Sequence, residues 1–193
     1  MLRVHRIPFS TNVERVALAA GHKGLEVEWV DHDPADRSAI ERLSGQPLVP
    51  VAEIDGELVV DSTRIVERLE QLVPNRPLYP AEPRACAEVE LFIEWFNEVW
   101  KGPPNAIAGG GDDPELRHRL AGWQGVFERL LETGDYLFGT FGAADVTAFP
   151  FLKYAVAEPD PEDTDPFHAV LRELEAPPRL RAWIERVDTQ PRA

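Results

Sequence analysis

The sequence predicts two successive domains, an α/β domain of order βαβαββα and then a domain made only of helices. Three observations support this prediction. Short apolar runs alternate with helix-periodic segments as far as Val73. A proline-rich stretch follows, Asn75–Pro80 with Pro83 soon after, and this composition is typical of a linker. Beyond it, every periodic segment has helical spacing. We therefore expect the α/β domain over residues 1–79 and the helical domain over residues 85–193.

The first strand and the first helix are expected at the start of the chain. Leu2–Ile7 is largely apolar and predicts a strand. The next apolar residues recur at the i, i+3, i+4 and i+7 positions of a helix, namely Val13, Val16, Ala17 and Ala20. Thr11, followed three residues later by Glu14, has the pattern of a capping box, and glycines beside Lys23 predict the helix end. Ser10 is therefore expected at a helix N-terminus, where unpaired backbone N–H groups favour an anion.

A second strand, a short helix and a β-hairpin are expected next. Leu25–Val30 alternates apolar and polar residues and predicts a strand with one wet face. A short helix is predicted over Ala39–Leu43. The apolar runs Leu48–Ile54 and Glu57–Val60 flank Asp55-Gly56, a pair that tolerates the positive φ angles of a tight hairpin turn. We expect parallel pairing of the first strands and an antiparallel edge from the hairpin.

The remaining segments are predicted to be helical. Asp61-Ser62 begins the last helix of the first domain, and Val73-Pro74 ends it. The helices of the second domain are expected over residues 85–101, 114–133, 145–156, 167–174 and 178–187. Pro103-Pro104 is expected to break the first of these helices. Because residues 145–156 are almost all apolar, this helix is predicted to be the buried centre of the domain.

Composition excludes several classes of function. The formal net charge of −14 opposes binding to nucleic acids or to anionic membranes, since both require a basic surface. The single cysteine, Cys86, excludes an internal disulfide, a two-cysteine redox motif and a thiolate zinc cluster. The five histidines lack metal-ligand spacing, so no metal is expected. With no apolar run near the ~20 residues of a membrane span and no secretory signal, a cytoplasmic protein is expected.

Four stretches, in this order, resemble motifs of the cytosolic glutathione transferases. They are Pro8-Phe9-Ser10 with Arg15-Val16, Gln46-Pro47-Leu48-Val49-Pro50-Val51, Asp61-Ser62-Thr63-Arg64-Ile65, and Phe141-Gly142-Ala143-Ala144-Asp145. The resemblance covers nearly the whole chain and is to serine-type, bacterial-like members. It implies a thioredoxin-like N-terminal domain, a GST-type helical bundle and glutathione as co-substrate. Gly142 departs from the family pattern, which has Ser or Thr there, so a weaker helix cap is expected.

The resemblance implies that Ser10 is the catalytic residue. A thiol with a pKa near ~8.5 is mostly protonated at neutral pH. A hydroxyl that donates a hydrogen bond to the thiolate, at a helix N-terminus, lowers that pKa. Thr11 and Asn12 are alternative donors to the sulfur. Because serine forms no mixed disulfide, addition of bound glutathione to an electrophile is favoured over glutaredoxin-like chemistry.

The other motifs are expected to hold the rest of the glutathione molecule. A cis Val49-Pro50 bond would present the backbone of Val49 to the cysteinyl part of the tripeptide, and Gln46 is placed to bind its backbone. Ser62, at a helix start, is expected to meet the γ-glutamyl carboxylate, and Asp61 the α-amino group. Taken singly, these residues also fit a proline kink, a surface amide and an ordinary helix cap.

Family geometry suggests that Phe9 and Trp100 line the pocket for a small hydrophobic electrophile, although an apolar stripe is more often plain core. A homodimer is also implied. Two alternatives stay open: a non-catalytic binding or regulatory module for another protein, and a glutathione-dependent reductase, dehalogenase or isomerase. Another low-molecular-weight thiol is an alternative to glutathione.

Overall fold

The computed structural model describes residues 1–111 and 113–193. The chain divides into two compact units. The first, which we call the N-unit, comprises Met1–Leu78 together with the last residues, Gln190–Ala193; the second, the C-unit, comprises Tyr79–Thr189. The return of Gln190–Ala193 to the N-unit differs from the expected division, which placed these residues in the helical domain.

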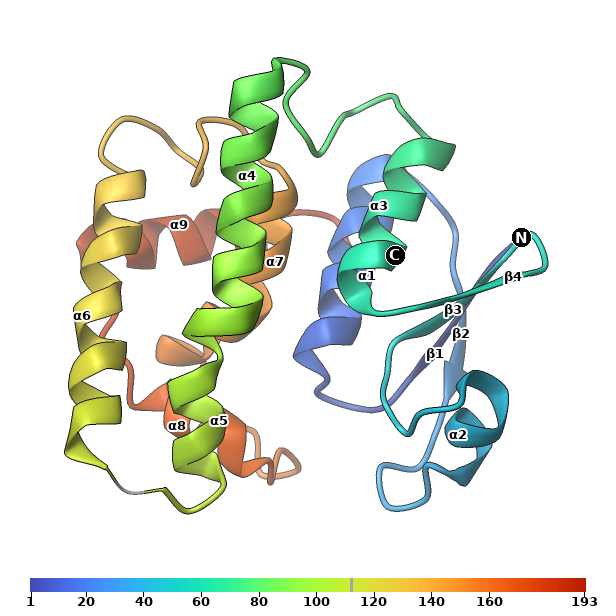
Figure 1. Cartoon of the computed structure of the whole chain (residues 1–193), viewed down its shortest axis with the longest axis horizontal. Coiled ribbons are helices and arrows are strands. Elements are labelled where there is room, and N and C mark those ends of the chain that lie inside the picture. Colours follow the sequence, from blue (N-terminus) through green and yellow to red (C-terminus); the bar gives the residue numbers. More distant parts are fainter. Residues whose placement is uncertain (112) are drawn as a thin grey trace. The chain divides into compact units, whose positions relative to one another are not determined.

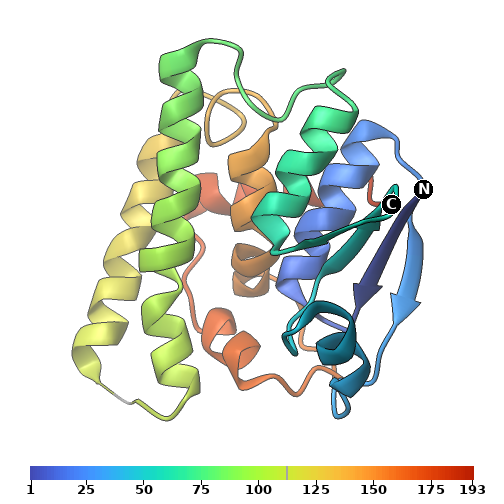
Figure 2. The ribbon, with the colours of Figure 1, turned by 45° about the vertical axis from the view of Figure 1, so that its right-hand side comes forward.

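The N-unit is a four-stranded mixed sheet with helices (Figures 1 and 2). Its strands are β1 (Leu2–Arg6), β2 (Glu28–Asp31), β3 (Val51–Ile54) and β4 (Glu57–Val60), in the spatial order β2-β1-β3-β4. β2 is parallel to β1, whereas β3 is antiparallel to both β1 and β4. The predicted order βαβαββα and the thioredoxin-like arrangement are therefore confirmed.

Three helices complete the N-unit: α1 (Thr11–Lys23), α2 (Ser38–Ser44) and α3 (Ser62–Leu72). α1 packs against α3, and the two lie side by side on one face of the sheet in Figure 2. The apolar faces of these elements form the core, in which Val4, Val16, Leu18, Val51, Ile65 and Leu69 are fully buried. Burial of this apolar area is the main force that holds the helices on the sheet.

Local hydrogen bonding explains why the start of the second strand differs from the prediction. Gly24 takes φ 68° at the end of α1, and the N–H of Leu25 donates to the carbonyl of Ala20 at 2.9 Å. Leu25 therefore completes the helix cap, and β2 begins at Glu28 instead of Leu25. The hairpin prediction is confirmed, since Asp55 and Gly56 have φ 51° and 89°.

The C-unit consists of helices in the described part of the chain. They are α4 (Pro83–Trp95), a π-helical turn (Phe96–Trp100), α5 (Gly102–Ala108), α6 (Pro114–Leu130), α7 (Ala143–Leu152), a 3-10 turn (Lys153–Ala155), α8 (Pro166–Arg172) and α9 (Pro178–Asp188). None of the described helices has the length and apolar character that crossing a bilayer requires.

Two features of the C-unit bear directly on the predictions. All residues of α7 are buried, which confirms a buried central helix. The helical segment predicted over residues 85–101 ends at Trp100, before Pro103-Pro104. A helix that was not predicted, α5, then begins at Gly102 and holds both prolines in its first turn. A proline is tolerated there because the first N–H groups of a helix have no intrahelical acceptor.

The start of α7 is held by one buried carboxylate. Asp145 Oδ1 accepts from the backbone N–H of Leu137 at 3.0 Å and from Trp183 Nε1 at 2.7 Å. Its Oδ2 accepts from the N–H of Gly142 at 3.0 Å. Asp145 thus caps α7 and joins it to α9 although Gly142 supplies no hydroxyl. Burial raises the pKa of Asp145 to about 6, and the three N–H donors oppose that rise.

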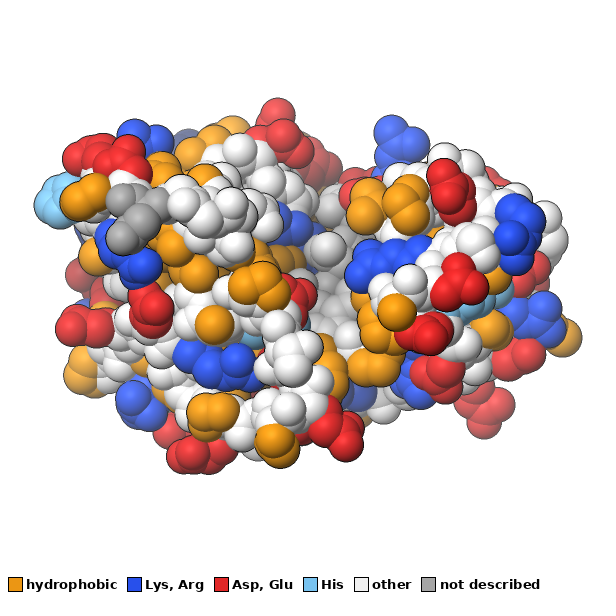
Figure 3. Space-filling view, turned by 90° about the horizontal axis from the view of Figure 1, so that it is seen from below, with side chains coloured by type: hydrophobic (Ala, Val, Ile, Leu, Met, Phe, Trp, Pro, Cys, Tyr) orange, Lys and Arg blue, Asp and Glu red, His pale blue; other side chains and the backbone are white. Residues whose placement is uncertain are grey.

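Figure 3 shows charged side chains of both signs on one face of the molecule. On the face drawn in Figure 3, acidic and basic groups are interspersed over each unit. Nucleic-acid-binding proteins instead present a continuous basic patch or stripe.

Candidate functional site

The site begins in the loop between β1 and α1. Ser10 is the N-cap of α1, with extended backbone angles, and its Oγ accepts from the N–H of Val13 at 3.3 Å. The predicted capping box is therefore displaced by one residue: Thr11 is the first residue of the helix and is buried. The Glu14 carboxylate accepts from the guanidinium of Arg192.

The surroundings of Ser10 allow its hydroxyl to donate a hydrogen bond to an anion. A serine hydroxyl can accept hydrogen bonds and donate one at the same time. Since Ser10 Oγ accepts from Val13, its own hydrogen can point away from the helix. The side chain is half-buried, and the positive end of α1 lies directly behind it. Phe9, the preceding residue, has φ 58° and is 38% exposed.

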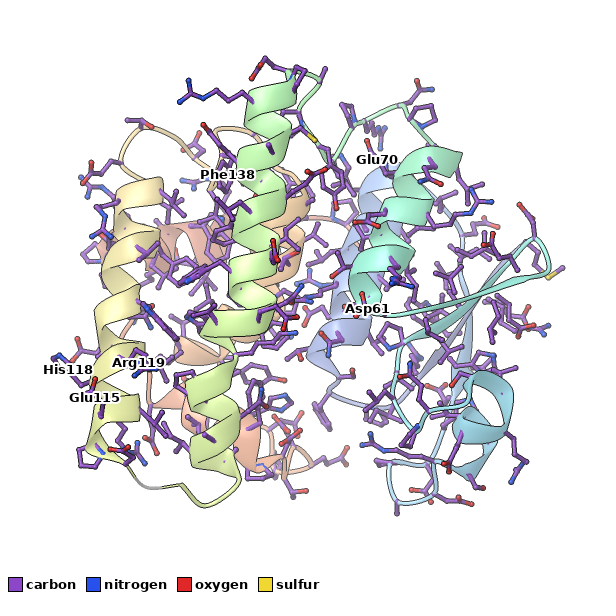
Figure 4. The ribbon with its side chains drawn as sticks, viewed as in Figure 1. Asp61, Glu70, Glu115, His118, Arg119 and Phe138 are labelled. Carbon is purple, nitrogen blue, oxygen red and sulfur yellow. The ribbon has the colours of Figure 1, made fainter. Side chains whose placement is uncertain are left out.

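A second helix N-terminus belongs to the site. Asp61 is the N-cap of α3, and its Oδ1 accepts from the N–H groups of Thr63 and Arg64 at 2.8 and 3.2 Å. Figure 4 shows Asp61 at this end of α3. Asp61 has φ 75°, which is uncommon for a residue other than glycine. Ser62, the next residue, is almost fully buried. Backbone strain of this kind concentrates at functional sites.

A buried arginine joins the two helix starts. Arg15 Nη1 donates to Ser62 Oγ at 3.3 Å, and Ser62 Oγ donates to Asn12 Oδ1 at 3.5 Å. Burial lowers the pKa of Arg15 to about 9, against the attraction of the Asp61 carboxylate. Arg15 therefore remains protonated at neutral pH and places a positive charge behind both N-termini.

Sequence reasoning missed the structural role of Arg15. The residue entered only as part of a motif, whereas its side chain connects α1 to α3. The available signal was the helical spacing of Arg15 with Leu18 and Ala19, which places a charged residue on an apolar face, and this is uncommon unless the charge is paired.

The loop before β3 carries the third part of the predicted site. The Val49-Pro50 peptide bond is cis, as predicted. Val49 lies outside the β1–β3 ladder, which begins with the pair His5–Val51. Pro50 is buried, and Gln46 is half-buried, with its backbone N–H and C=O both bonded to Ser44 Oγ.

The predicted residues are thus distributed over both units. Ser10, Asn12, Asp61 and Ser62 lie at the starts of α1 and α3, and a hydrogen bond joins Ser62 to Asn12. Trp100 belongs to the C-unit and is fully buried there, stacked on Phe96 with ring centroids 4.4 Å apart. Its place in a substrate pocket stays a prediction, to which this burial lends no support.

The described side chains favour neither a metal site nor a reactive cysteine. Within residues 1–111 and 113–193, no three His, Cys, Asp or Glu side chains are grouped as a metal would require. Cys86 lies near Glu90 at 3.6 Å, and burial together with this carboxylate raises the pKa of the thiol. A raised pKa reduces the fraction of thiolate, so Cys86 is poorly suited to act as a nucleophile.

The chain is similar to known proteins along both halves. The family model "Glutathione S-transferase, N-terminal domain" matches residues 4–77, and "Glutathione S-transferase, C-terminal domain" matches residues 80–186. A Drosophila melanogaster pyrimidodiazepine synthase is 27% identical over 99% of this chain and 78% of its own length. A glutathione transferase of Zea mays is 34% identical, over 46% of this chain and only 41% of its own length.

Solved structures share the fold. A tau class glutathione S-transferase of mango, Mangifera indica, superimposes with a TM-score of 0.80 at 18% identity, covering 98% of this chain and 89% of that one. A theta class enzyme of Xanthomonas axonopodis pv. citri, solved with glutathione bound, gives 0.78 at 19% identity, covering 98% and 93%. With one family model spanning most of each half, the chain belongs to the glutathione S-transferase family.

Proposed function

We propose that the protein is a glutathione transferase in which Ser10 activates the thiol of bound glutathione for attack on a small hydrophobic electrophile. The observation that carries this proposal is the position of Ser10: it caps α1, accepts from Val13, and retains its hydroxyl hydrogen for a donor role. A thiolate placed there gains this hydrogen bond and the field of the helix N-terminus, and both lower its pKa.

The N-unit offers partners for the rest of the tripeptide. The γ-glutamyl carboxylate is proposed to bind at the start of α3, to the Ser62 hydroxyl and nearby N–H groups, with the α-amino group at Asp61. The Val49 backbone pairs with the cysteinyl residue, and Gln46 contacts the ligand backbone. Thr11 and Asn12 are secondary candidates for the sulfur. Of these two, Asn12 is already engaged by Ser62, and Thr11 is buried.

The proposed reaction is a nucleophilic displacement. The glutathione thiol loses its proton to solvent, and the sulfur lone pair forms a bond to an electrophilic carbon. For an aryl halide, the bond from carbon to halogen then breaks, and halide leaves with the bonding electrons. A mechanism with a mixed disulfide at the protein has less support, because Ser10 has no sulfur and the single cysteine, Cys86, has a raised pKa.

The test separates activation of the thiol from capping of the helix. Ser10→Ala removes both the cap and the donor, whereas Ser10→Asn keeps a capping oxygen and supplies N–H donors. We expect Ser10→Ala to reduce turnover of a chromogenic aryl halide by about 10- to 100-fold, an effect in the range of one lost transition-state hydrogen bond. It should also raise the pKa of bound glutathione, measured by thiolate absorbance, while the glutathione Kd stays within about two-fold. Ser10→Asn should recover part of the activity.

Two controls address the alternatives. Thr11→Val has nearly the same shape, and its turnover should equal that of the wild type; a large loss there would move the donor role to Thr11. Failure of the wild type to bind glutathione, measured by calorimetry, would overturn the transferase proposal and favour a non-catalytic binding module. We also infer a homodimer, which light scattering would detect as twice the chain mass of 21.7 kDa.

A further inference from the structure

A chain of hydrogen bonds crosses the sheet of the N-unit and includes two histidines that the proposed transferase chemistry does not use. His5 Nε2 lies 3.0 Å from Glu53 Oε1, and His5 Nδ1 lies 2.8 Å from His32 Nε2. His5 belongs to β1 and Glu53 to β3, whereas His32 directly follows β2. His5 is only 8% exposed, and a protein partner lies at each of its ring nitrogens.

The hydrogen bonds determine where the protons lie when both rings are neutral. The hydrogen bond from His5, with the charge of Arg3 nearby, holds the pKa of Glu53 below its ordinary value, so this carboxylate is an acceptor. His5 therefore donates through Nε2, which leaves its Nδ1 without a hydrogen. His32 then donates to that nitrogen through its Nε2–H. Both rings can thus be neutral with every bond of the chain formed.

One added proton leaves the bond between the rings intact, but a second does not. An imidazolium still donates to a neutral ring beside it, so the first proton is accommodated. When both rings are protonated, each of the two nitrogens 2.8 Å apart carries a hydrogen, and no acceptor is left between them. The two positive charges also repel each other. The separated pair therefore binds more protons than the bonded pair, and acid favours separation.

Charged groups on the neighbouring strands also face the pair. Arg3, on β1, lies 3.0 Å from Glu28 of β2 and 3.6 Å from Glu53 of β3. Asp31, which ends β2 beside His32, pairs with Arg6 at 2.7 Å. Because each of these carboxylates already has an arginine partner, a second imidazolium charge gains little net attraction from them.

The bonds of His5 hold both ends of one segment, residues 32–53, against β1. This segment contains α2, and Ile40 is the buried one among the seven described residues of that helix. Arg37 stands at its N-cap, where arginine has no side-chain oxygen to accept from the helix N–H groups. A helix this short depends on tertiary contacts for its stability. We propose that His5 and His32 form a pH switch, in which protonation of both rings separates them and loosens α2.

The switch has a consequence for the proposed function. Gln46 and Val49, which are proposed to contact glutathione, lie on the same segment as α2. Acid should therefore weaken glutathione binding as well. This consequence rests on the proposed function, whereas the loosening of α2 does not.

Native-state hydrogen exchange of the full chain without ligand, at pH 7.5 and pH 5.0, tests the proposal. Protection factors, corrected for the intrinsic effect of pH, should fall about ten-fold or more in α2 and less than about three-fold in α1, since one extra bound proton changes an equilibrium about ten-fold per pH unit. His32→Gln should keep the protection of α2 at both pH values, because an amide can donate to a bare Nδ1 and accept from a protonated one. The matched control His118→Gln, at an exposed histidine of α6 (Figure 4), should keep the fall.

A third variant removes the bond at every pH. His32→Ala should give the low protection of α2 already at pH 7.5. The proposal is overturned if α2 of the wild type keeps its protection at pH 5.0 or has none at pH 7.5. It is also overturned if His32→Gln loses protection as the wild type does, or if His32→Ala keeps it at pH 7.5. Because glutathione is absent from these measurements, a failure of glutathione binding would leave their outcomes unchanged.

Discussion

Arg15 is the residue that connects the two helix N-termini of the candidate site. Its guanidinium is buried, holds Ser62 through a hydrogen bond of 3.3 Å, and remains charged next to Asp61. A buried charge destabilises the folded state unless other groups pair with it. At the N-terminus of α3, the proposed γ-glutamyl carboxylate would lie near the charge of Arg15.

Replacing Arg15 tests this connection. Arg15→Lys keeps the charge but loses the planar fork that reaches Ser62. We expect the glutathione Kd to rise about ten-fold, or about 1.4 kcal/mol, because Ser62 is no longer oriented. Turnover at saturating glutathione should change by less than about three-fold, since this residue does not touch the sulfur in the proposed geometry. Calorimetry and steady-state kinetics measure the two quantities.

A control separates orientation of Ser62 from a general loss of stability. Leu18→Ala, in the fully buried face of α1, should lower the unfolding free energy by about 2–5 kcal/mol and leave the glutathione Kd of the folded protein unchanged. An equal change in Kd for Leu18→Ala and Arg15→Lys would contradict the orienting role of Arg15.

At the scale of elements, the start of α7 depends on a carboxylate that titrates. Burial raises the pKa of Asp145 from 3.8 to about 6. The folded state therefore binds this proton more tightly than the unfolded state. The resulting stability is fully present below pH 3.8 and is lost as the pH rises through 6.

The expected loss is measurable against a variant that does not titrate at this position. From a shift of roughly two units, the wild type should lose about 2 kcal/mol of unfolding free energy between pH 4 and pH 7 relative to Asp145→Asn. Urea unfolding of both proteins across this range gives the difference. Parallel pH curves would show that the three N–H donors cancel the effect of burial.

The packing of the last residues on α1 gives a second prediction at this scale. A Cβ on Gly21 would lie 2.3 Å from the carbonyl oxygen of Pro191, which is backbone and cannot simply rotate away. Gly21→Ala should therefore destabilise the protein by about 1–3 kcal/mol, as overpacking does. The matched control is Gly122→Ala in α6, where a Cβ meets nothing within 4 Å. Helix propensity alone should stabilise that variant by up to about 1 kcal/mol. Chemical denaturation of both variants measures the two changes in unfolding free energy, which should have opposite signs.

At the scale of the whole molecule, local rules predicted most elements but not where separate segments meet. Asp55-Gly56 and Asp61 encode a turn and a cap within a few residues, and both were predicted correctly. The helix cap is Ser10 and not the adjacent Thr11, because Thr11 is buried in the tertiary packing. The hydrogen bond from Arg15 to Ser62 joins residues 47 positions apart, and the periodicity of the sequence cannot predict such a contact.

The C-terminal segment is the clearest case of such a long-range contact. After passing through the C-unit, the chain returns at Gln190–Ala193 to the N-unit. There the N–H of Ala193 donates to the carbonyl of Ala17 at 3.1 Å, and Trp29 Nε1 donates to the carbonyl of Ala193 at 3.2 Å. Arg192 pairs with Glu14 at 3.2 Å. The N-unit is therefore built from two separate segments of the chain, whereas the C-unit is continuous.

Removal of residues 190–193 should consequently affect the two units unequally. A chain ending at Thr189 loses the hydrogen bonds to Ala17 and Trp29, each worth about 0.5–1.5 kcal/mol, together with the contact at Gly21. Native-state hydrogen exchange should therefore show faster exchange for amides of α1 and unchanged exchange for amides of α7. Trp29 fluorescence should shift as its indole N–H becomes solvated. Equal loss of protection in both units would show that residues 190–193 stabilise the molecule as a whole. If amides of α1 lost no protection, the contacts of residues 190–193 would contribute nothing to the stability of the N-unit.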